Sequence, residues 1–272
     1  MTTETQKQET TPQAAEVLVK IDQPIDGITV LTLNRPRARN AVSFDLWQEL
    51  DSALNEAESA SPPRAIIITG AENFFCAGGD LKTPPSRGDA AMAPAARLEL
   101  GQRVLTRLRN LPVPVIAAVE GGAYGIGWSL ALACDMIIAA DQVKFCAPFL
   151  SLGLIPDGGF VWLLRRQIGL YKASEIIYSE RVVMADEAFN LGLVSHVVPT
   201  GTAIEAALAF ADKIGKGNQH SVQLTKRLLQ AAENTDLKSH NALELGLGVI
   251  CQTGPEVALV RTKMAAKKKN KG

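Results

Sequence analysis

The stretch Gly121-Gly122-Ala123-Tyr124-Gly125-Ile126-Gly127-Trp128-Ser129 lies between two apolar segments and decides how the chain is organised. The segment before it, Val115–Val119, is short and rich in β-branched residues, which predicts a buried strand. After it the sequence predicts a helix that ends before Asp135 and then a second strand, Met136–Ala140. A glycine-rich turn between a strand and a helix leaves backbone N–H groups free at the start of the helix. Such a turn can bind negative charge, either a phosphate or the oxyanion of a reacting carbonyl.

The glycine-rich turn also has a purely structural explanation. Its glycines do not fit the dinucleotide-binding fingerprint, and no Lys-Ser or Lys-Thr pair follows to complete a P-loop. A tight turn with close helix–strand packing requires the same residues. A second glycine turn, Phe75-Cys76-Ala77-Gly78-Gly79-Asp80-Leu81, follows another predicted strand at residues 65–69. Because an oxyanion hole takes one N–H from each of two such turns, the pair of turns indicates a site.

Composition limits the class of protein. The chain has 272 residues, 47% hydrophobic and 21% charged, as in a globular protein with one large domain or a core and a small appendage. Its 28 basic residues balance 28 acidic ones, so we expect no nucleic-acid partner. No apolar run is as long as a membrane span and no signal-peptide core is present, which predicts a cytoplasmic protein without a membrane partner. The 4 cysteines are widely spaced in apolar contexts, so we expect free thiols and no metal site.

Strand and helix signals alternate over most of the chain and give way to helices alone near its end. Further strands are predicted at residues 16–21, 28–33 and 143–147, and helices at residues 43–60, 97–111, 161–168, 172–178, 185–191, 203–214, 221–232, 237–252 and 256–266. A Pro-, Ala- and Gly-rich segment at residues 83–96 predicts a mobile loop. The predicted domains are a disordered leader (1–14), a core (15–200), a helical C-terminal subdomain (201–266) and a basic tail (267–272).

Asp157 is a candidate acid or base. It is the only ionisable residue between Lys144 and Arg165, and most of its neighbours in sequence are apolar. If they also surround it in space, desolvation raises the pKa of its carboxyl and makes it usable for proton transfer. An aspartate in a Pro-Asp-Gly turn is a common structural alternative.

Several motifs together resemble those of the crotonase (enoyl-CoA hydratase/isomerase) superfamily. They are residues 75–81, 114–121, 130–135, 153–159 and 185–198, and they follow the family's order across about residues 15–265. The resemblance implies an α/β fold, a crotonase-like spiral of ββα turns with a C-terminal helical trimerisation part. It also implies a homo-trimer or hexamer and a coenzyme A thioester as substrate, with no separate cofactor.

The resemblance also assigns roles to single residues. In the family, two backbone N–H groups hold the thioester oxygen. On this chain they fall on Gly79 and on Ile126, a position that is usually glycine in the family. Only the N–H of Ile126 is needed, so the change is tolerable if the backbone there suits a β-branched residue. Ala77 and Asp80, in the same turn as Gly79, are also predicted to contact substrate.

The loop at residues 34–41 carries three arginines in five positions, Arg35, Arg37 and Arg39. By itself such a cluster is explained equally well by phosphate binding and by a solvated loop. Arg37, Ala38 and Arg39 match the family loop that lies near the nucleotide end of the coenzyme. The resemblance therefore favours a phosphate contact.

The chain departs from the hydratases of the family at two positions. Those enzymes use two glutamates to add water, and this chain has Ser129 and Phe149 in their places. Neither side chain exchanges a proton at neutral pH, so the two-carboxylate mechanism is not expected. Asp157 instead matches the aspartate of a subgroup of enoyl isomerases, similar to the 1,2-epoxyphenylacetyl-CoA isomerase group. The predicted reaction is a double-bond shift through a thioester enolate, with Asp157 as the single base.

Four residues near these positions have open roles. Ser129 can hydrogen-bond substrate or water, and a structural role at the start of a helix is at least as good an explanation. Phe149, Trp128 and Tyr124 can shape an apolar acyl pocket, and each fits an ordinary core position equally well.

Three alternative functions stay open. Hydration or hydrolysis could proceed with Asp157 activating water. A dehalogenase of the family would use Asp157 as a nucleophile, but it also needs a histidine soon after the first oxyanion turn, and residues 83–100 contain none. A non-catalytic or RNA-binding relative is indicated only by the C-terminal lysines, which usually form a solvated end.

Overall fold

The large sheet forms the centre of the fold. The computed structural model describes residues 17–59, 63–83, 95–215 and 218–269, so the predicted leader, most of the predicted mobile loop and the end of the basic tail lie outside the described residues. The six strands of this sheet follow the order β1-β2-β3-β4-β6-β9. They are β1 (Val19–Ile25), β2 (Ile28–Leu33), β3 (Ala65–Gly70), β4 (Val115–Val119), β6 (Met136–Ala140) and β9 (His196–Val198). β1 and β2 pair antiparallel, and every other pair is parallel.

Three short strands form a second sheet. It contains β5 (Gly122–Tyr124), β7 (Lys144–Cys146) and β8 (Val183–Met184), in the order β5-β7-β8. Isolated bridges join Cys76 to Ala123 and Val42 to Gly79. The two glycine-rich turns of the sequence are therefore brought side by side through β5.

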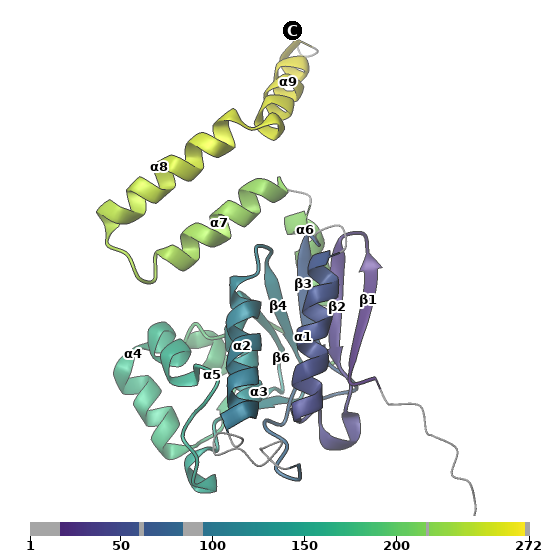
Figure 1. Ribbon diagram of the computed structural model, residues 1–272, viewed down its shortest axis with the longest axis vertical. Coiled ribbons are helices and arrows are strands. Elements are labelled where there is room, and N and C mark those ends of the chain that lie inside the picture. The colour runs from purple at the N-terminus through teal and green to yellow at the C-terminus, as the bar shows by residue number, and fades with distance from the viewer. Residues whose placement is uncertain (1–16, 60–62, 84–94, 216–217, 270–272) are drawn as a thin grey trace, which may run out of the picture.

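Helices cover both faces of the large sheet. On one face lie α1 (Phe44–Ser59), α2 (Ala96–Asn110) and α3 (Ile126–Ala133), as Figure 1 shows for α1 and α2. α4 (Phe160–Ser179) packs on α3, and α5 (Ala185–Asn190) contacts β8 and β9. α6 (Ala203–Gly215) covers the other face. Two short 3-10 helices, η1 (Pro36–Ala38) and η3 (Leu150–Leu152), lie in loops.

The two layers of helices explain why the central strands are apolar throughout. In β3, Ile66 and Ile68 face the larger core, whereas Ile67 belongs to the smaller core with Ala207 and Ala211 of α6. Successive side chains of a strand point to opposite faces, so a strand buried on both faces has no polar alternation.

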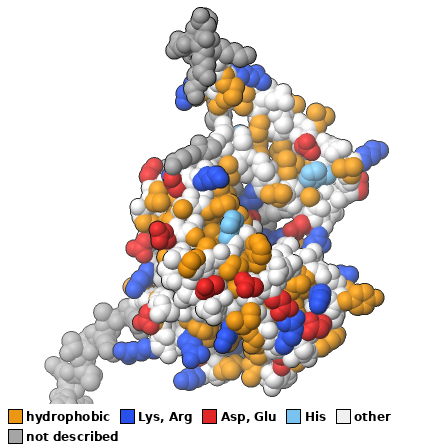
Figure 2. All heavy atoms as spheres, turned by 180° about the vertical axis from the view of Figure 1, so that it is seen from behind, with side chains coloured by type: hydrophobic (Ala, Val, Ile, Leu, Met, Phe, Trp, Pro, Cys, Tyr) orange, Lys and Arg blue, Asp and Glu red, His pale blue; other side chains and the backbone are white. Residues whose placement is uncertain are grey.

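The last three helices extend from the body of the molecule. α7 (Gln219–Ala231) and α8 (Leu237–Thr253) lie side by side, and α9 (Pro255–Lys269) follows at the C-terminal end (Figure 1). Side chains of Asn218 and Asp236 cap the starts of α7 and α8 by accepting hydrogen bonds from backbone N–H groups. Hydrophobic side chains are exposed over this part (Figure 2), among them Leu245, Val249, Ile250, Leu259 and Val260.

Within residues 17–59, 63–83, 95–215 and 218–269, no single helix combines the length and the apolar composition that crossing a membrane requires. One bent pair, Leu237–Thr253 with Val257–Met264, passes that test by length and composition only.

Most predicted elements are confirmed, with three strands missed. β5, β8 and β9 have two or three residues each and lie where the sequence predicted a turn, a loop or no element. The helices predicted at residues 161–168 and 172–178 are both present within α4, where Gly169 breaks the helical conformation with φ of 78°. α6, the first helix of the predicted C-terminal subdomain, packs on the sheet. All four cysteines are free as predicted, three of them buried and Cys251 only partly so.

Candidate active site

One small cavity brings together the three residues predicted to be catalytic. Gly79, Ile126 and Asp157 line a space of about 40 Å³, although they come from the turn after β3, the start of α3 and the loop before α4. Its other lining residues are Val42, Trp47, Arg97, Leu98, Gly101 and Gly158. The fold thus joins segments that are far apart in sequence around one small volume.

The N–H of Gly79 is left free by the bridge that holds its turn. The N–H of Val42 donates to the carbonyl of Gly78 at 2.8 Å, and the N–H of Asp80 donates to the carbonyl of Val42 at 3.0 Å. Since N–H groups alternate sides along an extended chain, the N–H of Gly79 points away from Val42. Within the described residues it has no hydrogen-bond acceptor, so it is available to a bound oxygen.

The N–H of Ile126 is available for a different reason. Ile126 is the first residue of α3, and the first N–H groups of a helix have no acceptor within the helix. The preceding Gly125 has φ of 52°, and its carbonyl accepts from the N–H groups of Trp128 and Ser129. Ile126 itself has an ordinary negative φ, which a β-branched residue adopts without strain.

The glycines allow the two turns to lie against each other. A Cβ at Gly127 would lie 2.7 Å from three atoms of Cys76, and a Cβ at Gly78 would lie 2.9 Å from the carbonyl oxygen of Tyr124. Gly78 also has φ of 101°, which few other residues adopt. The structural explanation of the glycine turns is therefore confirmed, and the same close packing brings the N–H-bearing residues Gly79 and Ile126 to one cavity, where their binding of an oxyanion stays a prediction.

The carboxyl of Asp157 is largely buried at this cavity, which Arg97 also lines. Its Oδ1 atom is buried and has no hydrogen-bond partner in the described part of the chain. Burial raises the pKa of the Asp157 carboxyl, and the charge of Arg97 offsets part of this rise. Such a carboxylate is poorly solvated and therefore well suited to accept a proton.

Ser129 is hydrogen-bonded to the backbone of Asp157. Its side chain is fully buried, and its hydroxyl donates to the backbone carbonyl of Asp157 at 3.0 Å. This contact supports the structural role of Ser129. Gly158 and Gly159, with φ of 63° and 77°, turn the chain from Asp157 into α4.

Trp128 and Phe149 are core residues in this structure. Trp128 is fully buried, and its ring centroid lies 5.4 Å from that of Phe145 and 5.1 Å from that of Phe160. Phe149 packs on Phe160 at 5.8 Å, and neither predicted residue lines the cavity. Both side chains thus pack as the core alternative describes, and contact of either one with substrate stays a prediction. Of the three aromatic candidates only Tyr124 is half-buried, and it packs edge-on against Phe74.

The arginine loop, residues 34–41, is bonded to the glycine turn at residues 75–81. The N–H of Ala77 donates to the carbonyl of Arg39 at 2.9 Å, and the guanidinium of Arg35 pairs with Asp80 at 2.9 Å. Although burial alone would raise it, the N–H of Lys82 and the guanidinium of Arg35 hold the pKa of Asp80 below its usual value.

Arg37 and Arg39 are exposed beside this turn, and Ala38 lies between them in η1. Phosphate binding by this loop stays a prediction. The buried side chain of Asn40 was not predicted. It accepts from the N–H of Arg35 and donates to the carbonyls of Ala71 and Phe74.

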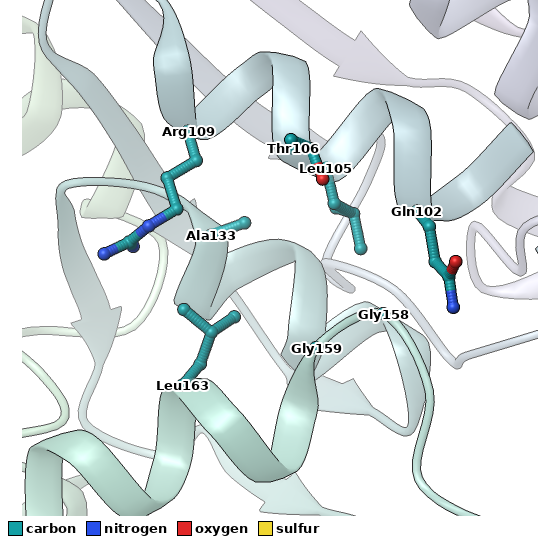
Figure 3. A pocket seen from close by; sticks show the side chains of 8 residues that line it. All are labelled: Gln102, Leu105, Thr106, Arg109, Ala133, Gly158, Gly159 and Leu163. Carbon is teal, nitrogen blue, oxygen red and sulfur yellow. The ribbon is translucent and has the colours of Figure 1, made fainter. Parts of the chain in front are cut away.

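A larger groove begins next to the cavity (Figure 3). It has a volume of about 290 Å³ and lies between α2 and the start of α4. Its lining residues are Gln102, Leu105, Thr106, Arg109, Ala133, Gly158, Gly159 and Leu163. Gly158 lines both spaces, so the groove is adjacent to the carboxyl-bearing residue. In the view of Figure 3, Arg109 lies at one end of the groove and Gln102 at the other.

Arg109, at one end of the groove, is held by residues of other elements. Its guanidinium pairs with Glu233 and stacks on the ring of Trp162. Within the described ranges, no three His, Cys, Asp or Glu side chains are grouped to hold a metal ion.

Comparisons with known proteins find relatives that match most of this chain. The profile of the enoyl-CoA hydratase/isomerase family matches residues 24–256. The short-chain-enoyl-CoA hydratase of Clostridium acetobutylicum is 34% identical over 224 residues, which are 80% of this chain and 83% of the relative. The 2,3-dehydroadipyl-CoA hydratase of Escherichia coli is 35% identical over 217 residues, 80% of this chain and 84% of the relative.

Solved structures match over nearly the whole chain. An enoyl-CoA hydratase from Bacillus anthracis superposes with a TM-score of 0.85 at 31% identity and covers 93% of this chain and 96% of its own. One from Polaromonas sp. JS666 gives a TM-score of 0.86 at 32% identity, with coverage of 92% and 97%. The predicted crotonase-like α/β fold with a helical C-terminal part is thus confirmed. These names give no support to the epoxyphenylacetyl-CoA isomerase subgroup. The chain belongs to the enoyl-CoA hydratase/isomerase family of the crotonase superfamily.

Proposed function

We propose that this chain catalyses proton transfer at the α-carbon of an enoyl-CoA thioester. The observation that carries the proposal is the shared cavity, in which two free backbone N–H groups and one poorly solvated carboxyl meet. The N–H groups of Gly79 and Ile126 would bind the thioester oxygen and stabilise the negative charge that develops on it. Asp157 would then accept the proton that is lost when the enolate forms.

Isomerisation is the reaction that this set of groups fits best. Asp157 would remove an α-proton from a 3-enoyl-CoA, and the C–H electron pair would form the enolate. Collapse of the enolate with delivery of a proton from the Asp157 carboxyl to the γ-carbon leaves the double bond between carbons 2 and 3, and exchange of that carboxyl proton with solvent lets deuterium enter the product. Nothing is added to the substrate, so a single carboxyl suffices. Asp157 is the only carboxyl that lines the cavity within the described residues.

Hydration is the second candidate, and the names of the relatives favour it. Both the Clostridium and the Escherichia relatives are named hydratases. In hydration Asp157 would take a proton from water as the oxygen adds to carbon 3, and carbon 2 would receive a proton from the same carboxyl. The departures at Ser129 and Phe149 argue against the mechanism with two glutamates, since both side chains are buried and neither can ionise.

The remaining parts of the substrate and the assembly follow from the surfaces around the cavity. The exposed Arg37 and Arg39 would contact phosphate groups of the coenzyme, and the groove beside Gly158 would receive the acyl group. The exposed hydrophobic side chains of α8 and α9 suit packing between copies in a homo-trimer or hexamer. We place the protein in the cytoplasm.

The test is incubation of the protein in D2O with 3-enoyl-CoA, 2-enoyl-CoA and saturated acyl-CoA thioesters, followed by mass spectrometry. Deuterium uptake with conversion of the 3-enoyl to the 2-enoyl thioester, both lost in Asp157→Asn, is the expected result. Asp22→Asn is the matched control, because Asp22 is an exposed aspartate on β1 far along the chain from the cavity residues. Addition of water to the 2-enoyl thioester would establish hydration. No change in any thioester would overturn the proposal.

A further inference from the structure

Arg97 stands at a position where a cation is locally unfavourable. It is the second residue of α2, in the first turn of that helix. The free N–H groups at a helix start carry partial positive charge, so an arginine there loses stability that an acidic residue would gain. A residue that opposes the local preference of its element is a candidate for a role in a site.

Two contacts direct the Arg97 side chain to the catalytic cavity. Its Nη1 donates to the backbone carbonyl of Asp80 at 3.0 Å, so it is held beside the oxyanion turn that contains Gly79. The side chain also lines the same cavity as Asp157. Arg97 therefore contacts the turn that would bind the thioester oxygen, and it lines the same cavity as the carboxyl that would move the proton.

We propose that Arg97 is a positioning residue whose charge keeps the Asp157 carboxyl ionised in the cavity while its anchor on Asp80 fixes the oxyanion turn. The proposal rests on the proposed function, because it gives Arg97 its role through the base. It adds a second group to the proton-transfer machinery that the family motifs do not contain.

The other described residues that line the cavity supply no positive charge near the Asp157 carboxyl. On the oxyanion turn the charge of Asp80 is paired with Arg35. α1 presents Trp47 to the cavity and α3 presents Ile126, neither of which is charged. Among the described residues that line the cavity, Arg97 is the cation and Asp157 the anion. The influence of Arg97 on the Asp157 carboxyl is opposite in sign to that of burial.

Three variants distinguish an effect of the Arg97 charge on Asp157 from a purely structural contact of the Arg97 side chain. Arg97→Met removes the charge and keeps much of the length of the side chain. Arg97→Lys keeps the charge and changes the shape. Arg103→Met is the matched control, because Arg103 lies on the same helix, is exposed and pairs with Asp51 of α1 at 3.3 Å.

The first readout is the pH dependence of kcat/KM for deuterium exchange into the thioester. In Arg97→Met the acid limb should move to higher pH by about one unit, which is about a tenfold loss of rate below that limb. Arg97→Lys should restore the limb, and Arg103→Met should leave it in place. An equal loss at every pH, with the limb unmoved, would overturn the proposal and leave Arg97 as a structural contact.

The second readout needs no substrate and separates this proposal from the proposed function. The carboxyl carbon of Asp157 is followed by NMR in protein labelled with [13C]aspartate, and Asp157→Asn identifies its signal. A titration that moves to higher pH in Arg97→Met supports the role of Arg97 even if no thioester is turned over. A titration that does not move overturns it, whatever the activity.

Discussion

Burial of the Asp157 carboxyl affects both the stability of the folded protein and the proposed proton transfer. Burial raises the pKa of its carboxyl, so the folded protein binds this proton more tightly than the unfolded chain does. The free energy of unfolding contributed by this group is then highest below the unfolded pKa and falls as pH rises through the raised value. At a pH above this raised value, the ionised carboxylate lowers the free energy of unfolding, as is common for active-site groups.

We therefore expect Asp157→Asn to raise the melting temperature at pH 8 while abolishing proton exchange. The gain should be a few degrees, and it should shrink as the pH is lowered toward the raised pKa of Asp157, where the wild-type carboxyl takes up a proton. Circular dichroism melts at pH 8 and at successively lower pH measure this, with Asp22→Asn as a control that changes a surface charge only. A variant that melts below the wild type at pH 8 would show that the carboxylate makes stabilising contacts.

The sequence predicts some site residues and leaves others open for physical reasons. Gly79 and Ile126 contribute backbone N–H groups, and a glycine turn before a helix shows in the sequence wherever it occurs. Trp128 and Phe149 could not be placed, because a large apolar side chain suits a pocket wall and a core equally well. Arg97 could not be found at all, since its contact with the carbonyl of Asp80 leaves no signal in the sequence around either residue.

Among the elements, α3 depends on its close contact with Cys76, in the glycine turn at residues 75–81. Gly127 lies in the first turn of this helix, and a Cβ there would come within 2.7 Å of the Cβ, the carbonyl oxygen and the Sγ of Cys76. Neither the backbone oxygen nor the buried thiol can move away freely. An alanine at this position must therefore push the start of α3 away from the turn that holds Gly79.

Gly127→Ala should accordingly lower both stability and kcat. Overpacking of this kind costs about 1–3 kcal/mol of unfolding free energy, and separation of the two N–H groups should reduce kcat more than it changes KM. Gly246→Ala is the opposite control, because a Cβ on this helical glycine of α8 meets nothing within 4 Å and should stabilise by about 0.5–1 kcal/mol. Urea unfolding and steady-state kinetics of both variants test the pair. Wild-type kcat in Gly127→Ala would contradict the role of the close contact.

Long, periodic elements were predictable, whereas the shortest ones were not. The central strands stand out as apolar runs and the long helices as amphipathic segments of three turns or more. β5, β8 and β9 contain two or three residues, too few for any periodicity, and they become strands only because neighbours supply hydrogen-bond partners. β5 matters most, because it sets the two oxyanion turns side by side.

In the molecule as a whole, a partly buried ion pair helps to join the helical extension to the core. The ammonium of Lys226 on α7 lies 2.7 Å from a carboxylate oxygen of Asp135, just before β6, and donates to the carbonyl of Val113 at 2.8 Å. The side chain of Lys226 is only 6% exposed, whereas that of Asp135 is 28% exposed. The sequence gives no sign of this contact, since a lysine in an amphipathic helix is normally solvated.

Loss of this pair should weaken the attachment of α7 to the core. In Lys226→Met the Asp135 carboxylate keeps the N–H of Val115 as a donor but loses its counter-charge. Because Asp135 is partly solvated, we expect a loss of about 1–3 kcal/mol, less than for a fully buried pair. In Lys226→Met/Asp135→Asn no uncompensated charge remains, so the double variant should lose less than the sum of the two single variants. Urea unfolding of the four proteins gives the coupling energy directly. Strictly additive losses would show that the two side chains act independently.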